Sequence, residues 1–290
     1  MPARRSLKDF RISPSFVLTG GPMLAWQLIF FLGAGILLIL MTFWTVQNYR
    51  LVADYNWGNW TSILSSDLFY TIYFRTIFYA AFAAALATVL AFPLSYALAF
   101  KSSPRTQRIA FMLLILPYFT NYYVRSYSWR FMLEDDGIIN SALSVFGLSL
   151  VGFQGSFAPT LVGYMGYFFP LVALVQLLSL MYISRDYLEA ANNLGAGRLR
   201  SIVTVVIPMA RSGLILGFAF GFMLAMGDYI APSYLGSGGR PTLSILIINT
   251  IQGQSDFPRA SVISVVMILT LMTVFFIAFR YAFPPRSNPR

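Results

Sequence analysis

The chain has 290 residues, of which 58% are hydrophobic and only 10% are charged. A soluble domain carries about 25% charged residues, so this composition excludes one and indicates a membrane protein. The absence of Cys and His excludes a disulfide framework, a Cys/His metal site and a thiol or imidazole catalyst. The net charge of +10 is spread between long apolar runs, which argues against a nucleic-acid-binding surface.

Six apolar stretches with few or no charges are long enough to cross a bilayer, which takes about 20 residues per helix. In chain order they cover residues 24–46, 76–100, 109–124, 159–182, 212–227 and 260–279. Prolines 93, 117 and 170 predict a kink or a loosened turn in the second, third and fourth spans. The shorter apolar stretch 242–251 favours an interfacial or re-entrant helix over a seventh crossing. The predicted fold is therefore an all-α membrane protein with six transmembrane helices.

The distribution of cations predicts the orientation of these spans. With six crossings, one side of the membrane holds fourteen Lys and Arg residues and three acids, whereas the other side holds six cations and seven acids. Because cytoplasmic loops are enriched in Lys and Arg, both termini are expected to be cytoplasmic. This topology predicts a cytoplasmic N-terminal segment over 1–23, a first transmembrane helix over 24–46 and a cytoplasmic tail over 282–290.

Small residues recur along the fifth span, and acidic residues follow the third and fifth spans. Gly213, Gly217 and Gly221 recur at four-residue spacing, which predicts a face where another helix approaches closely. Asp228 ends the fifth span, and Asp136 belongs to an acidic cluster after the third. An acid near aromatic residues suits a cationic solute through charge attraction and cation–π contact, although a solvated helix cap is the competing interpretation for both.

The cytoplasmic loop 184–211 is the most informative part of the chain. Asp186 and Glu189 are spaced as in a capping box, which predicts a short helix from about 187 to 194 with Asp186 as its N-cap. Gly195 is placed to end that helix in a left-handed conformation. A second helical stretch is expected from about Arg198 to Pro208. Such a helix exposes small and apolar side chains that suit docking into a groove of a partner protein.

One motif in this loop is characteristic of a known family. Glu189-Ala190-Ala191, three residues, Gly195, nine residues and Val205-x-Ile207-Pro208 resemble the EAA signature of permease subunits of bacterial binding-protein-dependent, type I ABC importers. The resemblance implies that the importer transmembrane domain covers 67–281 and that loop 184–211 is its coupling loop. It also implies ATPase-coupling roles for Glu189, Ala190, Ala191, Gly195 and Pro208.

Three further segments resemble the spermidine/putrescine-type branch of these permeases. They are the run from Tyr123 to Trp129 followed by Asp136 to Asn140, the run from Gly227 to Gly236, and the run from Asp256 to Ala260. The resemblance implies a pathway for polyamines or a related small cationic solute. The residues expected to line it are Asp228, Tyr229, Trp129, Tyr127 and Asp136.

The resemblance also implies the partners. These are two cytoplasmic ATP-binding subunits, a second permease subunit that is alike or related, a periplasmic solute-binding protein and membrane lipid, in the bacterial inner membrane. The chain itself contains only two Lys residues, Lys8 and Lys101, and neither lies in a phosphate-binding loop, so it is not expected to be an enzyme. No catalytic residue, cofactor or metal is expected.

Three alternatives remain open from the residues alone. The first is an importer permease for a different small solute. The second is a secondary transporter or channel that works without an ATPase, which the scarcity of charge within the spans argues against. The third is a non-transporting membrane anchor or receptor subunit, which would need the loop but no cavity.

Overall fold

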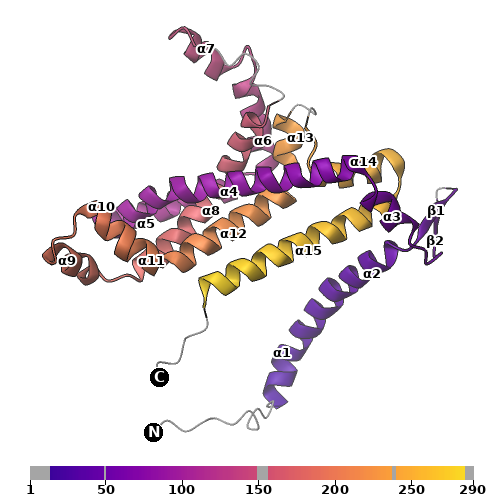
Figure 1. The fold of residues 1–290 in the computed structure, drawn as a ribbon, viewed down its shortest axis with the longest axis horizontal. Helices are drawn as coiled ribbons and strands as arrows, with labels where there is room; N and C mark the ends of the chain where they lie inside the picture. Colours follow the sequence, from indigo (N-terminus) through magenta and orange to yellow (C-terminus); the bar gives the residue numbers. More distant parts are fainter. Residues whose placement is uncertain (1–13, 49, 149–155, 237–239, 285–290) are drawn as a thin grey trace.

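The computed structural model describes residues 14–48, 50–148, 156–236 and 240–284, which form a long helical bundle with a separate first helix (Figure 1). The parts of the predicted N-terminal segment and tail at 1–13 and 285–290 lie outside the described residues. The longest helices of the described bundle are α4 (Asp67–Lys101), α8 (Ala158–Met181), α12 (Arg211–Gly227) and α15 (Phe257–Ala282).

Three of these helices make the centre of the bundle. α4 contributes a buried row of small residues that includes Ala80, Ala84, Ala87 and Ala91, and α8 and α12 pack against it. Two hydrogen bonds join α4 to α8: Ser95 Oγ donates to the carbonyl oxygen of Ala173 at 2.9 Å, and Gln176 Nε2 donates to that of Thr88 at 3.0 Å. Small side chains and interhelical polar contacts replace the hydrophobic effect as the source of helix association in a bilayer.

The predicted third span is broken rather than continuous. It consists of α5 (Pro104–Ile115), a short 3-10 helix (Leu116–Phe119) and α6 (Tyr122–Leu133). Pro117 cannot donate a backbone hydrogen bond, and Asn121 begins the next helix by accepting one from the amide of Tyr123 at 2.9 Å. The other two prolines, Pro93 and Pro170, lie inside helices that continue through them.

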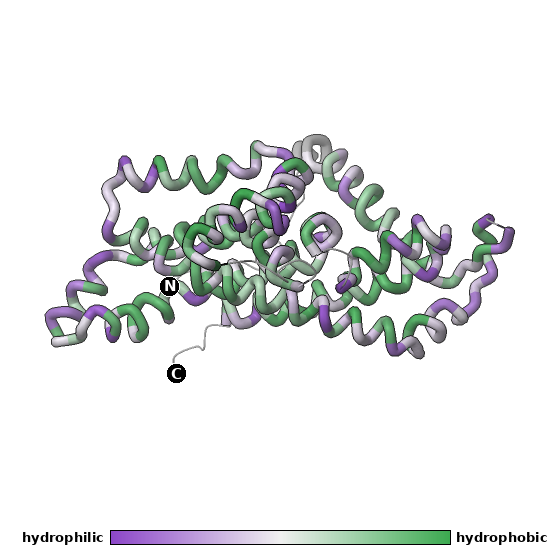
Figure 2. The backbone as a smooth tube through the Cα atoms, turned by 90° about the horizontal axis from the view of Figure 1, so that it is seen from above, coloured by the Kyte–Doolittle hydropathy of each residue, from purple (hydrophilic) through white to green (hydrophobic). Residues whose placement is uncertain are grey.

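Four helices of the described chain are long and apolar enough to cross a membrane: Gly20–Met41, α4, α8 and α15. A fifth crossing would be the bent pair 198–209 and α12, whose axes differ by 71°. The broken third span does not qualify as one helix, so the count of six crossings stays a prediction. Figure 2 shows the hydrophobic segments concentrated in the middle of the molecule and hydrophilic stretches mainly toward its ends.

The turns and short helices sort to two ends of the bundle. In Figure 1 the turn between α4 and α5 and helix α9 (Asp186–Asn193) lie at one end of the bundle, and both α15 and the rod that starts with α1 (Pro14–Gln27) have their terminal ends on that side of the hairpin. That arrangement agrees with the predicted grouping of the termini with the two basic loops. The predicted short helix at 242–251 is confirmed as α14 (Leu243–Gln254), at the opposite end. α7 (Ile138–Ser144) is a short helix between the predicted third and fourth spans.

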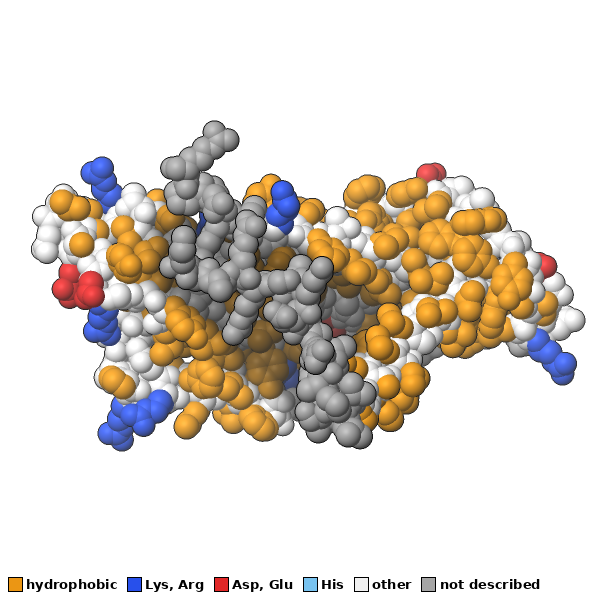
Figure 3. Space-filling model, turned by 90° about the horizontal axis from the view of Figure 1, so that it is seen from below, with side chains coloured by type: hydrophobic (Ala, Val, Ile, Leu, Met, Phe, Trp, Pro, Cys, Tyr) orange, Lys and Arg blue, Asp and Glu red, His pale blue; other side chains and the backbone are white. Residues whose placement is uncertain are grey.

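The first helix separates from the bundle along most of its length. α1, a π-helical stretch (Leu28–Leu32) and α2 (Gly33–Met41) form one rod, which contacts α15 through α2. None of the Gly20–Met41 window is buried, and Phe31 is 75% exposed. Figure 3 shows that hydrophobic side chains cover much of the face on which this helix lies. An apolar surface of this extent requires lipid or another protein to cover it.

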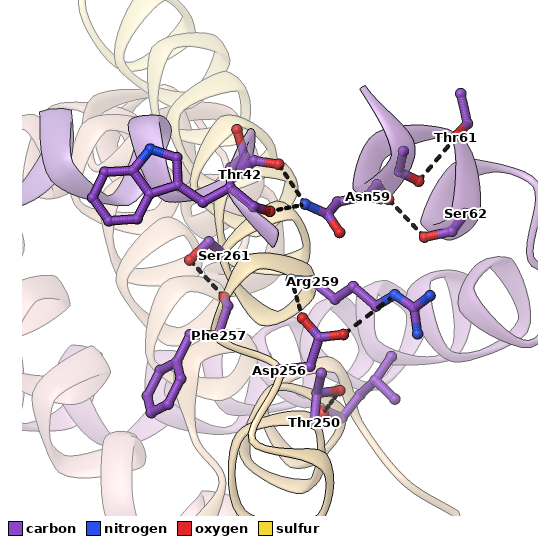
Figure 4. Close-up of polar contacts among 12 residues, drawn as sticks. Thr42, Asn59, Thr61, Ser62, Thr250, Asp256, Phe257, Arg259 and Ser261 are labelled. Atoms are coloured by element: carbon purple, nitrogen blue, oxygen red, sulfur yellow. Dashed lines mark hydrogen bonds and ion pairs between the residues drawn. The ribbon is translucent and has the colours of Figure 1, made fainter. Parts of the chain in front are cut away.

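A small hairpin follows the first helix, within an architecture that is otherwise helical. Strands β1 (Thr45–Gln47) and β2 (Arg50–Val52) pair antiparallel, so the helix ends at Met41 rather than at residue 46. The last carbonyls of a helix have no partner within it. Asn59, on α3 (Gly58–Leu64), supplies a hydrogen-bond donor just past the end of the helix. Its Nδ2 donates to the carbonyl oxygens of Thr42 at 2.9 Å and Trp44 at 2.7 Å (Figure 4).

Candidate functional site

Helix α9, in the coupling loop 184–211, begins one residue earlier than predicted. Asp186 is its first residue and not its N-cap, since Arg185 occupies that position without a capping side-chain bond. Instead, Ser184 Oγ accepts a hydrogen bond from the amide of Asp186 at 3.3 Å and donates one to its carboxylate at 2.9 Å. Asp186 and Glu189 therefore both lie in the first turn, where negative charge is favoured by the helix dipole.

The C-terminal end of α9 is confirmed as a left-handed glycine turn. Gly195 has a φ of +83°, and its amide donates to the carbonyl oxygen of Asn192 at 2.9 Å. The next amide, of Ala196, donates to the carbonyl of Ala191 at 3.0 Å. These two bonds make a Schellman motif, which directs the chain away from the helix in one defined direction.

One face of α9 is attached to the bundle and the other is open. Leu188 packs against the inner hydrophobic cluster that contains Leu180 and Val206. By contrast, Tyr187 is 54% and Leu194 is 89% exposed. The signature residues Glu189 and Ala190 are also exposed, and Ala191 is half-buried. The helix is thus held on its bundle side while it presents a mixed acidic and apolar surface outward.

After a non-helical turn over 194–197, the loop continues toward α12 through helical segments. α10 (Arg198–Ser201), a π-helical turn (Ile202–Val206) and α11 (Ile207–Met209) follow one another, and Pro208 lies exposed in α11. The wider turn precedes the proline, whose missing amide and bulky ring disfavour a regular helix there. At Ala210, which is only 1% exposed, the chain turns by 71° into α12. A short series of helical segments and the buried Ala210 therefore connects the end of α9 to α12.

The glycines of α12 lie on the face that contacts α8 and α4, as their spacing predicted. A Cβ on Gly213 would lie 2.2 Å from Ser179 Cβ. A Cβ on Gly217 would lie 3.3 Å from Val172, and one on Gly221 would lie 3.4 Å from Ala84. The close approach at Gly213 is near the inner end, where the coupling loop joins the span.

Asp228 follows α12 directly and is only 7% exposed. Its Oδ1 accepts a hydrogen bond from the amide of Ile230 at 2.8 Å, and its Oδ2 accepts from the amide of Ala231 at 3.3 Å. These bonds cap the short helix α13 (Ile230–Leu235). Tyr122 of α6 adds a third, since its hydroxyl donates to Oδ2 at 2.5 Å. Asp228 is thus a buried cap rather than a solvated one, and it also lines a cavity of about 330 Å³ with Tyr122 and Tyr229.

An aromatic surface joins α6 to α13. The hydroxyls of Tyr123 and Tyr229 are hydrogen-bonded to each other. Tyr127 lies edge-on to Tyr234, with 6.0 Å between ring centroids. Trp129, on another side of α6, faces α8, because a Cβ on Gly166 would lie 3.3 Å from its Nε1.

The predicted pathway residues are only partly brought together. Tyr229 and Asp228 are adjacent, and Tyr127 lies on the same aromatic surface through Tyr234. Asp136 is exposed in the turn after α6, whereas Tyr122, the partner of Asp228, begins that helix. The two ends of this helix are roughly 17 Å apart at 1.5 Å per residue. Asp136 therefore does not share a site with Asp228.

The sequence alone assigned no site role to Tyr122, Tyr234 or Arg125, and the packing of Leu188 against the bundle was not predicted. Arg125 Nη1 donates to the carbonyl oxygen of Pro117 at 2.8 Å, and its guanidinium lies 5.5 Å from the ring centroid of Tyr122. The basic residue thus stabilises the break in the third span. A proline that interrupts a helix leaves nearby backbone carbonyl groups without their usual hydrogen-bond partners. In the sequence, Pro117 was therefore the signal that a neighbouring side chain would have to donate a hydrogen bond.

The architecture is that of an all-α membrane protein with an importer transmembrane fold. A family model described as the binding-protein-dependent transport system inner membrane component matches residues 91–288, more than half of the chain. The chain belongs to this family, and it is a multi-pass protein of the bacterial inner membrane.

Individual relatives are more distant. The spermidine/putrescine transport system permease protein PotB of Escherichia coli (strain K12) is 25% identical over 173 residues, 58% of this chain and 62% of that protein. The putative 2-aminoethylphosphonate transport system permease protein PhnU of Salmonella paratyphi A is 27% identical over 179 residues, 61% of each chain. The matched region thus spans less than two thirds of the length of these relatives.

The fold also resembles a solved structure. A chain of a bacterial alginate ABC transporter, solved in complex with an alginate pentasaccharide-bound periplasmic protein, superimposes with a TM-score of 0.75 at 16% identity. The superposition covers 95% of this chain and 96% of that one. At this identity the likeness concerns the fold alone.

Proposed function

We propose that the chain is the permease subunit of an ATP-driven ABC importer for polyamines or a related small cationic solute. The observation that carries the proposal is the geometry of the coupling loop. A short helix, α9, is exposed on its outer face, ends in a glycine turn and runs through Pro208 and the buried Ala210 into α12. Such a helix suits the transfer of motion from a separate ATPase to the spans.

In this mechanism the α9 helix docks into a groove on the ATPase. Tyr187, Leu194 and Ala190 provide apolar contact, and Glu189 pairs with a cation of the partner. When ATP binding closes the two ATPase subunits, α9 moves with them. Leu188 on the inner cluster and the corner at Ala210 transmit that movement to α8 and α12, which alternates access to the solute pathway. ATP hydrolysis belongs to the partner, and this chain supplies no catalytic group.

The proposal includes a second permease subunit and a periplasmic solute-binding protein. The exposed rod of the first helix supports the former, since its apolar surface suits packing against another membrane chain or lipid. The family's own description, a binding-protein-dependent system, supports the latter. The outer end of the bundle, with α14 and the hairpin, is the surface on which the binding protein would dock.

For the solute, the similarity to the spermidine/putrescine permeases favours a polyamine. Asp228 and Tyr229 line one cavity, and the Tyr123, Tyr127 and Tyr234 rings lie beside it. A buried carboxylate beside aromatic rings attracts an ammonium group by charge and by cation–π contact. Asp136 lies apart from this cavity, so we propose for it at most a role in the outer approach of the solute.

A second solute class has its own support. Arg125 lies against the Tyr122 ring while Asp228 bonds to the Tyr122 hydroxyl, so groups of both signs flank one side chain. The resemblance to a putative 2-aminoethylphosphonate permease favours a solute with an amine and an anionic group. Competition of radiolabelled putrescine uptake by 2-aminoethylphosphonate and by spermidine separates the two classes.

The coupling role is tested in the complete importer reconstituted in vesicles. Glu189→Lys and Gly195→Arg should leave the permease inserted but uncouple ATP hydrolysis from uptake. Full transport by both variants, with the ATPase copurifying at the normal ratio, would contradict the proposal. A change confined to solute selectivity would instead locate the defect in the pathway.

A further inference from the structure

A hydrophobic groove lies between α5 and α8 at the end of the bundle that carries the basic loops. Its lining includes Phe111 and Met112 from α5 and Leu177, Leu178 and Met181 from α8, and its volume is about 360 Å³. Met112 is 69% exposed, Met181 52% and Leu178 49%. The groove therefore opens along the side of the bundle, where it meets the acyl region of the bilayer.

Cations gather at one end of this groove. Arg108 belongs to its lining, and Arg105 precedes it by one turn of α5. Lys101 ends α4 immediately before, with its ammonium 5.6 Å from the centroid of the Tyr96 ring. Within the described part of the chain, none of these three cations forms an ion pair with an acid. Arg108 instead has its Nε 3.4 Å from the carbonyl oxygen of Pro104 on its own helix.

The same segment is held rigidly, so the groove is a preformed feature. Gln107 Nε2 donates to the carbonyl oxygen of Leu98 at 2.9 Å, which fixes the start of α5 against the end of α4. Leu177, at the floor, is only 1% exposed. The walls of the groove therefore belong to two helices whose relative position is set by polar and apolar contacts.

We infer that this groove binds an anionic phospholipid of the cytoplasmic leaflet, such as phosphatidylglycerol. An acyl chain occupies the apolar trough, and the phosphate lies among Arg108, Arg105 and Lys101. This arrangement matches both parts of the phospholipid. Apolar side chains line the trough for the acyl chain, and cations with no acidic partner among the described residues lie where the phosphate meets the membrane boundary. A neutral solute would satisfy only one of these two parts.

The inference is tested on the purified permease with its partner subunits in detergent, by native mass spectrometry of retained lipid. Phosphatidylglycerol is titrated against phosphatidylcholine of the same chain length. Arg108→Gln should weaken phosphatidylglycerol retention about fivefold, the effect expected for one cation at the membrane surface. Met112→Trp, which obstructs the trough and keeps every cation, should also reduce retention.

Arg280→Gln is the matched control, since Arg280 is an exposed cation in the last turn of α15 and not part of the groove. It should leave the retention of phosphatidylglycerol unchanged. Equal losses in the Arg108 and Arg280 variants would overturn the inference, because net charge alone would then explain binding. Equal retention of phosphatidylcholine and phosphatidylglycerol by the unaltered complex would overturn it too.

Discussion

The hydroxyl of Tyr122 donates a 2.5 Å hydrogen bond to the carboxylate of Asp228, which joins the second half of the broken third span to the end of α12. The same carboxylate caps α13 through two backbone amides. One side chain therefore connects α6 to α12 and α13, which are consecutive helices much later in the sequence. If α12 moves relative to α6, the hydrogen bond between Tyr122 and Asp228 either breaks or keeps these two residues moving together.

Tyr122→Phe should destabilise the permease by about 1.5–3 kcal/mol, the contribution of a hydrogen bond to a charged group. Thermal unfolding of the reconstituted complex measures the loss. Tyr127→Phe is the control, because Tyr127 is 48% exposed and its hydroxyl forms no hydrogen bond to the described residues. Equal shifts for both variants would show that the bond to Asp228 contributes nothing specific.

The two roles of Asp228 are separable by substitution. Asp228→Asn keeps an oxygen that accepts from the α13 amides, whereas Asp228→Ala leaves them without a cap, which costs about 1 kcal/mol. The Ala variant should therefore unfold at the lower temperature. Uptake of a cationic solute should fall in both variants and uptake of a neutral solute should not; the absence of that difference would remove Asp228 from the pathway.

Gly195→Ala should weaken the coupling helix, because an L-residue at a φ of +83° costs about 1–2 kcal/mol. Hydrogen exchange of the 186–194 amides should accelerate, and transport per ATP hydrolysed should fall. Gly197→Ala is the matched control two residues away, since its φ is −66° and a Cβ there meets nothing within 4 Å. If both variants exchange alike, the left-handed turn is not what orders α9.

Gly213→Ala should destabilise the contact between α12 and α8 by about 1–3 kcal/mol, because the new Cβ would lie 2.2 Å from Ser179. Ser179→Gly removes the opposing Cβ, so the double variant should recover much of the thermal stability. Gly227→Ala serves as the control on the same helix, because a Cβ at that position contacts nothing within 4 Å. Failure of the double variant to recover would place the strain elsewhere.

Features set by neighbouring residues were predictable from the sequence. The glycine turn at Gly195 and the break at Pro117 both arise from the backbone properties of single residues. The N-cap of α9 was predicted one position late, since Asp186 is itself the first helical residue and its carboxylate accepts a hydrogen bond from the Ser184 hydroxyl. The stacked glycines of α12 followed from helical periodicity.

Contacts between distant segments were not predictable in the same way. The pairing of Tyr122 with Asp228 joins residues separated by 106 positions, and sequence periodicity carries no information about such a partner. The separation of Asp136 from Asp228 has the same origin, because the length and direction of α6 decide it. The hairpin after Met41 was also missed, since the apolar run continues past the end of the helix into β1.

The attachment of the first helix has a practical consequence. The Asn59 amide holds the carbonyls of Thr42 and Trp44, while the opposite half of the rod, including Met23 at 69% exposure, stands clear of the other helices. A fluorophore at Met23 would consequently report on whatever surrounds the rod in the bilayer. Its emission would distinguish acyl chains from a protein neighbour without disturbing the bundle.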